Sequence, residues 1–290
     1  MGTQFTSRLK LTDRKRIYAG IVDALQDQLP YPAVPTSRAP GAAKKSKEPE
    51  TARTARSKKA AAGSGGKTPS VVQTVKSLST AQRQRFGDAA LKEVLNVVAD
   101  HDFFDTFKQS ALFTDVLKWL LRLRGDAEFT GFEEIISEYG MEQSATPVSV
   151  LAQKLEELTS KARTDPFRVA SASAAKAILV ETSLLKVPPK TEAPARSFGK
   201  KLATLNTRYL VTRYVHSFVY EVLSKTMSMS DPTSNDTVVQ EARAEIRKAT
   251  ERIAKKAVDR IVKEGKINDA GRIQQIVIEG LMDYRRPAAA

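Results

Sequence analysis

The chain contains no cysteine and only two histidines, His101 and His216, among its 290 residues. The absence of thiols excludes disulfide bonds and thiolate chemistry, and two histidines cannot build a histidine-rich metal site. Long apolar runs are also missing, since no stretch approaches the length of a membrane span and the N-terminus lacks the apolar core of a signal peptide. We therefore expect a soluble, intracellular protein with no membrane span.

Positive charge is abundant and unevenly spread. The formal net charge is +14 and the pI is about 9.8, a balance that favours polyanionic partners such as nucleic acid. Half of the excess lies in residues 30–70, where only Glu48 and Glu50 oppose nine basic residues. These are Arg38, Lys44, Lys45, Lys47, Arg53, Arg56, Lys58, Lys59 and Lys67.

The same segment, residues 30–70, is rich in Ala, Ser, Thr, Gly and Pro and has almost nothing to bury. Such a composition cannot offset the entropy cost of ordering, so we expect a disordered basic linker. In composition it resembles the tails of histones and linker histones. It divides the chain into an N-terminal amphipathic arm at 1–29 and a helical domain at 71–290.

Outside the linker, the apolar residues recur at three- and four-residue steps, and no stretch alternates with period two. The pattern predicts an all-α protein with about nine helices. Their expected ranges are 13–29, 79–99, 102–125, 130–140, 146–162, 165–186, 198–229, a start at 231 or 236 running to 263, and 269–284.

Capping signals help to place these boundaries. Thr12 can cap the first helix, and Ser79 with Gln82 forms a capping box, as does Thr130 with Glu133. Asp102 with Asp105 can open a helix that stops at Gly125. Asp165, followed by a proline, is an expected start, Gly140 and Gly265 are expected stops, and the last helix is expected to begin at Asp269.

The stretch 197–229 is the expected centre of the fold. Between Leu202 and Leu223 it carries apolar residues on almost every side, and a helix that is apolar all round is normally buried. Other helices would pack around it, with Arg208, Arg213 and His216 pointing outward or finding partners. Basic and aromatic residues also interleave here, as in proteins that stack on single strands, although a core helix with a basic rim has the same pattern. They are Lys200, Lys201, Arg208 and Arg213 with Tyr209, Tyr214 and Tyr220.

The helix expected up to residue 263 has a narrow seam of small and branched residues and a basic outer surface. The seam residues are Ala242, Ile246, Ala249, Ile253, Ala257 and Ile261. The cations mostly outside it are Arg243, Arg247, Lys248, Arg252, Lys255, Lys256, Arg260 and Lys263. This helix is suited to close helix pairing, within the chain or between copies, while its outer face could contact phosphates. A solvated face held by pairs such as Glu251 with Lys255 is the alternative.

Two patterns suggest enzymatic sites. The run from Ala61 to Thr68 formally matches a phosphate loop, but the strand before it and the helix after it are missing, and Pro69 disfavours helical geometry at Thr68. Asp100, His101, Asp102 and Asp105 could form a small metal cluster, but an N-cap with a first-turn acid is the simpler explanation. We expect neither an enzyme nor a cofactor or metal.

The leading hypothesis is a non-enzymatic nucleic-acid-binding or packaging protein. In it, the linker contacts phosphates without sequence preference and the helical domain mediates self-association into an oligomer. The predicted nucleic-acid-binding residues are Lys44, Lys45, Lys47, Arg53, Arg56, Lys58, Lys59, Lys67, Lys248, Arg252, Lys255 and Lys256. The alternative is a helical protein–protein adaptor or scaffold subunit of a larger complex that docks through the first helix.

Overall fold

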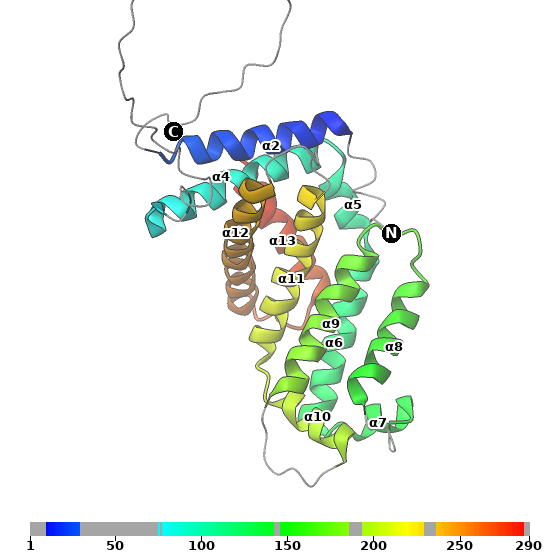
Figure 1. Cartoon of the computed structure of the whole chain (residues 1–290). Coiled ribbons are helices and arrows are strands. Elements are labelled where there is room, and N and C mark those ends of the chain that lie inside the picture. Colours follow the sequence, from blue (N-terminus) through cyan, green and yellow to red (C-terminus); the bar gives the residue numbers. More distant parts are fainter. Residues whose placement is uncertain are drawn as a thin grey trace, which may run out of the picture.

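The computed structural model describes residues 10–29, 75, 77–141, 146–185, 193–228 and 236–286. Over these residues the chain forms eleven helices and no strand, so it is all-α as predicted (Figure 1). The helices are α2 (Leu11–Gln26), α4 (Thr80–Ala99), α5 (Phe103–Gln109), α6 (Ala111–Phe129), α7 (Glu133–Tyr139), α8 (Pro147–Ser160), α9 (Arg168–Leu184), α10 (Pro194–Ala203), α11 (Thr207–Ser228), α12 (Asp236–Lys263) and α13 (Ala270–Arg285). None of the helices in these ranges is long and apolar enough to cross a membrane.

The N-terminal helix α2 lies alongside α4, in the opposite direction, at one end of the molecule (Figure 1). Its apolar side, with Ile17, Ile21 and Leu25, is buried and belongs to the same core as the other helices. The predicted cap at Thr12 is wrong. The helix begins two residues earlier, because the Lys10 amide donates to the Asp13 carboxylate at 2.8 Å and so favours a start at Leu11.

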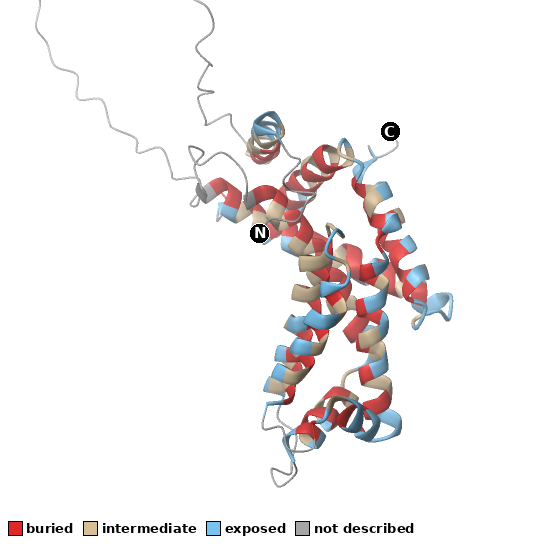
Figure 2. Ribbon diagram, turned by 90° about the vertical axis from the view of Figure 1, so that its right-hand side faces the viewer, coloured by how far each residue is buried: buried red, intermediate tan, exposed pale blue. Residues whose placement is uncertain are grey.

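The second long helix, α4, follows the prediction closely. Ser79 and Gln82 form the expected capping box, with backbone-to-side-chain hydrogen bonds of 2.9 and 3.2 Å. Its predicted core side is buried throughout: Phe86, Ala90, Val94, Leu95 and Val98. Buried residues lie along the faces that the helices turn toward one another (Figure 2).

Aromatic rings from α5, α6 and α11, and from the turn before α9, form the densest part of the core. Phe218 lies at the centre, with its ring 5.0 Å from that of Phe107, 4.8 Å from Phe113 and 5.8 Å from Phe167. Such edge and stacked arrangements add to the burial of aromatic surface. They tie helices that are far apart in the sequence.

The single helix predicted for 102–125 is two helices, α5 and α6, divided at Ser110. The Gln274 amide on α13 donates to the carbonyls of Phe107 and Ser110 at the break, at 2.7 Å and 2.8 Å. The predicted stop at Gly125 is also wrong, since α6 continues to Phe129. A partner more than 160 residues away therefore stabilises the break, which explains why the local pattern missed it.

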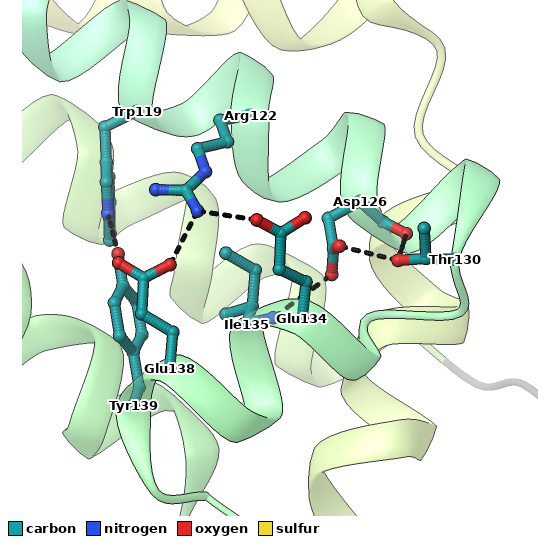
Figure 3. A network of polar contacts seen from close by, with 8 residues as sticks. All are labelled: Trp119, Arg122, Asp126, Thr130, Glu134, Ile135, Glu138 and Tyr139. Carbon is teal, nitrogen blue, oxygen red and sulfur yellow. Dashed lines mark hydrogen bonds and ion pairs between the residues drawn. The ribbon is translucent and has the colours of Figure 1, made fainter.

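The predicted capping box of Thr130 with Glu133 does not form. Thr130 instead donates to the Asp126 carboxylate at 2.6 Å, and the other oxygen of Asp126 accepts the Ile135 amide (Figure 3). The residue before α7 is Phe132, which has a φ of +75° and is fully buried. The buried carboxylate of Asp126, which accepts from Thr130 and Ile135, thus takes the place of the predicted capping box at the start of α7.

The outer face of α6 is fastened to α7 by a second group of polar contacts (Figure 3). Arg122 pairs with Glu134 at 3.1 Å and Glu138 at 2.6 Å, and Trp119 Nε1 donates to the Tyr139 hydroxyl at 3.0 Å. The predicted end of α7 at Gly140 is confirmed, and Gly140 has a left-handed φ of +62°.

The stretch predicted as one central helix is also two helices, α10 and α11, separated at residues 204–206. Asn206 accepts the Arg208 amide at 2.7 Å and starts the second helix, while the Leu205 carbonyl accepts from Arg124 of α6 at 2.8 Å. Of the two helices, α11 has the central position that was predicted for the whole stretch. It packs against α9 and α12 and also contacts α4 and α6.

The last two helices form as predicted. α12 ends at Lys263 before Gly265, whose φ is +69°, and the Asp269 side chain caps α13 by accepting the Arg272 amide at 2.9 Å. All six residues of the predicted seam on α12 are buried, against α4, α11 and α13. The predicted linker at 30–70 lies outside the described residues.

Candidate nucleic-acid interface

Helices α11 and α12 run side by side in opposite directions. A surface groove lies between them on their outer side. The direction follows from two contacts, Arg208 near the start of α11 with Asp259, and His216 further along with Arg247. The main groove has a volume of about 660 Å³, and a hollow of about 340 Å³ lies beyond it toward the start of α11. The main groove is lined by Arg213, His216, Tyr220, Gln240, Arg243, Ala244, Arg247, Lys248 and Glu251, and the hollow by Asn206, Arg208, Tyr209, Thr212, Lys255 and Asp259.

The groove exists because both helices are amphipathic at this place. The seam of α12 turns Ala242, Ile246 and Ala249 inward, so the residues between them point away from the core. Those residues include Arg243, Arg247 and Lys248. The two helices therefore place basic side chains from both walls at one surface.

Four of these cations are held by carboxylates. Arg208 pairs with Asp259, and Arg213 forms a forked pair with Glu181 of α9. Lys248 and Lys255 pair within α12. The partners are Glu245 and Glu251, each at 2.8 Å. The hydrogen bonds with Glu181 raise the pKa of Arg213 further, so it stays charged. These four pairs cancel most of the local charge.

Two guanidinium groups in the groove, those of Arg243 and Arg247, have no carboxylate partner among the described residues. They lie one turn apart on α12, and the Nε of Arg243 is buried without a hydrogen-bond partner among the described residues. Arg247 lies over the ring of Tyr220, 5.7 Å from its centroid. After the four pairs are set aside, these two side chains leave the groove with a positive charge and unused donors, which suits a phosphate group.

His216 sits on the floor of the groove between the two helices. Its Nε2 lies 3.1 Å from the Arg247 carbonyl, which can only accept, so Nε2 carries the proton. Its Nδ1 then faces Arg213 Nη1 at 3.4 Å as an acceptor. Burial lowers the pKa of His216, the carbonyl opposes this, and the charge of Arg213 adds to the lowering. His216 is therefore a neutral residue that joins the two helices, in keeping with the expectation that it would point outward or find partners.

The predicted binding residues on α12 do not share one face. Lys248 lines the main groove and Lys255 the adjoining hollow. Arg252 instead reaches α4, where it pairs with Asp88 beside the Tyr284 hydroxyl, and Lys256 lines a separate hollow of about 340 Å³ between α12 and α13. The eight predicted linker residues lie outside the described residues. They are Lys44, Lys45, Lys47, Arg53, Arg56, Lys58, Lys59 and Lys67.

The residues that the predicted set omitted are Arg243 and Arg247. One signal was present for Arg243, because no acidic residue lies three or four positions from it and so no helical ion pair can form. The sequence does not show that Arg247 lacks a partner, because Glu251 lies four residues later and could pair with it. In the structure Glu251 pairs with Lys255 instead. Only the packing of α11 against α12 places both beside Tyr220.

The predicted interleaving of basic and aromatic residues on α11 is only partly a surface feature. Tyr209 is 51% exposed and Tyr220 is partly buried at the groove. Tyr214 is a core residue, fully buried, and donates to the Phe113 carbonyl at 3.0 Å. Lys201 belongs to α10 and donates to the Ser183 carbonyl at 2.7 Å, at the end of α9.

The acidic residues around His101 have a structural task. Asp100 pairs with Arg16 at 2.7 Å, and His101 Nε2 lies 3.0 Å from the Asp13 carboxylate, so both fasten α2. Asp102 has a left-handed φ of +58° and its side chain does not cap α5. In the part of the chain that the structure describes, no three acidic or histidine side chains lie together as a metal site.

Comparison with known proteins gives no relative: no family model, no curated protein and no solved structure matches the chain. The candidate interface is therefore defined by its own geometry. It is an open groove with a tyrosine, a neutral histidine and two arginines that lack a carboxylate partner in the described residues, and a second tyrosine lies in the adjoining hollow.

Proposed function

We propose that the protein is a non-enzymatic nucleic-acid-binding or packaging protein that contacts phosphates through the α11–α12 groove and the basic segment at 30–70. The observation that carries this proposal is the pair Arg243 and Arg247, which line one groove without a carboxylate partner in the described residues. Arginines left without acidic partners beside an aromatic ring are typical of phosphate and nucleic-acid recognition. The overall charge of +14 supports it by drawing polyanions to the surface.

The groove and the segment would act together. Phosphate contacts made by surface cations release counterions and give affinity without sequence preference. The groove adds a fixed arrangement of donors, since Arg243 and Arg247 are positioned by a helix whose inner face is buried. Binding at the groove should therefore depend on particular side chains, whereas binding through the segment should depend on charge alone.

The test is the double variant Arg243→Gln with Arg247→Gln in the full chain. Binding of a labelled mixed-sequence single strand should weaken by about tenfold or more, because two charge-assisted hydrogen bonds are lost. The slope of log K against log salt should become shallower by about 1.4, for two fewer phosphate contacts on a single strand. Fluorescence anisotropy across a salt series measures both quantities.

A matched control removes the same charge elsewhere. Lys161 and Arg163 are exposed in the turn between α8 and α9 and line neither the groove nor its hollow. The double variant Lys161→Gln with Arg163→Gln should bind almost as wild type. Equal weakening in both doubles would mean that overall charge alone attracts the strand, and the groove would lose its assignment.

Self-association remains part of the proposal, but the seam of α12 does not supply it. All six seam residues are buried within the chain, so a second copy would have to use another surface. The adaptor alternative needs the first helix to dock on a partner, whereas the apolar side of α2 is buried on α4. An adaptor would therefore have to release α2 or use its outer face.

A further inference from the structure

Tyr209 presents an exposed aromatic ring at one end of the α11–α12 seam. It is 51% exposed and lines the smaller hollow with Arg208, Thr212 and Lys255. A tyrosine ring left half open to water beside two cations adds little to the core. It is an open platform for another flat ring.

A second ring continues this surface along α11. Tyr220 follows Tyr209 by eleven residues, close to three full helical turns, so both point to the same side of α11. The rise between them is about 16 Å. Arg247 covers the ring of Tyr220, while the described residues place no cation over Tyr209. One ring is thus covered by an arginine, while the other is open to a ligand.

Duplex and single-stranded nucleic acid expose different groups, so we expect the groove to bind them differently. A duplex stacks its bases internally and offers a wide convex surface of phosphates, which cannot deliver a base face to Tyr209. A single strand exposes base faces and phosphates together, and it is flexible enough to enter a groove of about 660 Å³.

We infer that the α11–α12 groove binds single-stranded nucleic acid, with a base stacked on Tyr209 and phosphates on Arg243 and Arg247. The inference rests on the proposed function and names its ligand class. Stacking on a tyrosine tolerates every base, because each has a π-face, so the site should read no sequence. The paired cations Arg208 and Lys255 then line the hollow at the stacked base without a net charge of their own.

The experiment compares four forms of the full chain: wild type, Tyr209→Ala, Tyr209→Phe and Phe129→Ala. Phe129 is the matched control, an aromatic residue that is 83% exposed at the end of α6 and outside the groove. The ligands are a mixed-sequence single strand, an abasic strand of equal length that keeps the phosphates, and the duplex. Circular dichroism checks that every variant is folded.

The single strand should bind wild type more tightly than either other ligand. Tyr209→Ala should weaken its binding by between about fivefold and about 150-fold, whereas Tyr209→Phe and Phe129→Ala should change it little. Binding of the abasic strand should not respond to Tyr209→Ala, since it has no base to stack. Equal weakening of duplex and single-strand binding by Tyr209→Ala would overturn the inference, because a duplex presents no base face to the ring.

Two outcomes separate this inference from the proposed function. If Tyr209→Ala weakens the abasic and base-bearing strands equally, the ring supports the groove rather than a base, and the stacking inference is wrong. If Tyr209→Ala has no effect while the Arg243 and Arg247 double variant loses binding, phosphate binding stands and stacking falls. If neither variant changes strand binding, both proposals fail.

Discussion

At the scale of single residues, His216 shows how the groove is held in shape. Its ring bridges the Arg247 carbonyl of α12 and the Arg213 guanidinium of α11, which is itself anchored on Glu181 of α9. A neutral imidazole can do this because it donates at one nitrogen and accepts at the other. A protonated ring would lose the acceptor and place a second cation beside Arg213.

We predict that His216 makes stability depend on pH. Burial first, and then the charge of Arg213, lower its folded pKa. The unfolded imidazole therefore takes up a proton as pH falls below about 6.5, before the folded one does. The free energy of unfolding should fall from pH 7 until the folded pKa is passed, by about 1.4 kcal/mol for each unit of lowering.

His216→Gln provides the measurement. Its amide can still donate to the Arg247 carbonyl but does not titrate, so chemical unfolding between pH 7 and pH 5 should show a flatter dependence than wild type. A variant that keeps the full pH dependence of wild type would show that another group is responsible.

At the scale of helices, close approach depends on glycine at a few positions. A Cβ on Gly87 of α4 would lie 2.9 Å from the backbone carbonyl oxygen of Glu245 on α12. The backbones of α4 and α12 therefore lie close together at this point. The same contact brings α12 into register with α4, where Arg252 meets Asp88. The position of α12, and hence of Arg243 and Arg247, depends on this contact.

We predict opposite effects for two glycine substitutions. Gly87→Ala should lower the free energy of unfolding by about 1–3 kcal/mol, because a backbone atom cannot move aside as a side chain can. Gly125→Ala, in the interior of α6 with nothing within 4 Å of the new Cβ, should raise it by about 1 kcal/mol. Urea unfolding measures the change in the free energy of unfolding for each variant. Changes of the same sign would contradict the packing described for Gly87.

At the scale of the whole molecule, the N-terminal helix is part of the folded body. Ile17 and Ile21 are buried to 1% or less exposure on α4, and Arg16 and Asp13 reach Asp100 and His101. Removing the chain up to residue 70 would delete this helix together with the basic segment. The contribution of the segment to binding must therefore be measured by substitution in the full chain.

Replacing the nine basic residues of 30–70 with Gln or Ser should remove most of the salt dependence. If about six of them contact phosphates of a duplex, the slope of log K against log salt that they supply is near −5. A single strand should then retain a slope near −1.4 from Arg243 and Arg247. A slope that does not change on substitution would show that the segment does not contact the phosphates.

The sequence by itself determined that the protein is all-α, where several helices begin or end, and which residues of α4 and α12 face the core. These follow from local causes: apolar spacing, the capping box at Ser79, the cap at Asp269, and the stops at Gly140 and Gly265. Such signals act within one or two helical turns, so they are visible in the chain alone.

Tertiary structure decided the rest, because the deciding partners lie far away in the chain. Gln274 stabilises the break at Ser110, and Arg124 binds the Leu205 carbonyl where the predicted central helix divides. The groove is likewise a product of packing. Glu181 and Asp259 neutralise Arg213 and Arg208, while Arg243 and Arg247 have no carboxylate partner among the described residues, and only the fold determines which cation meets which carboxylate.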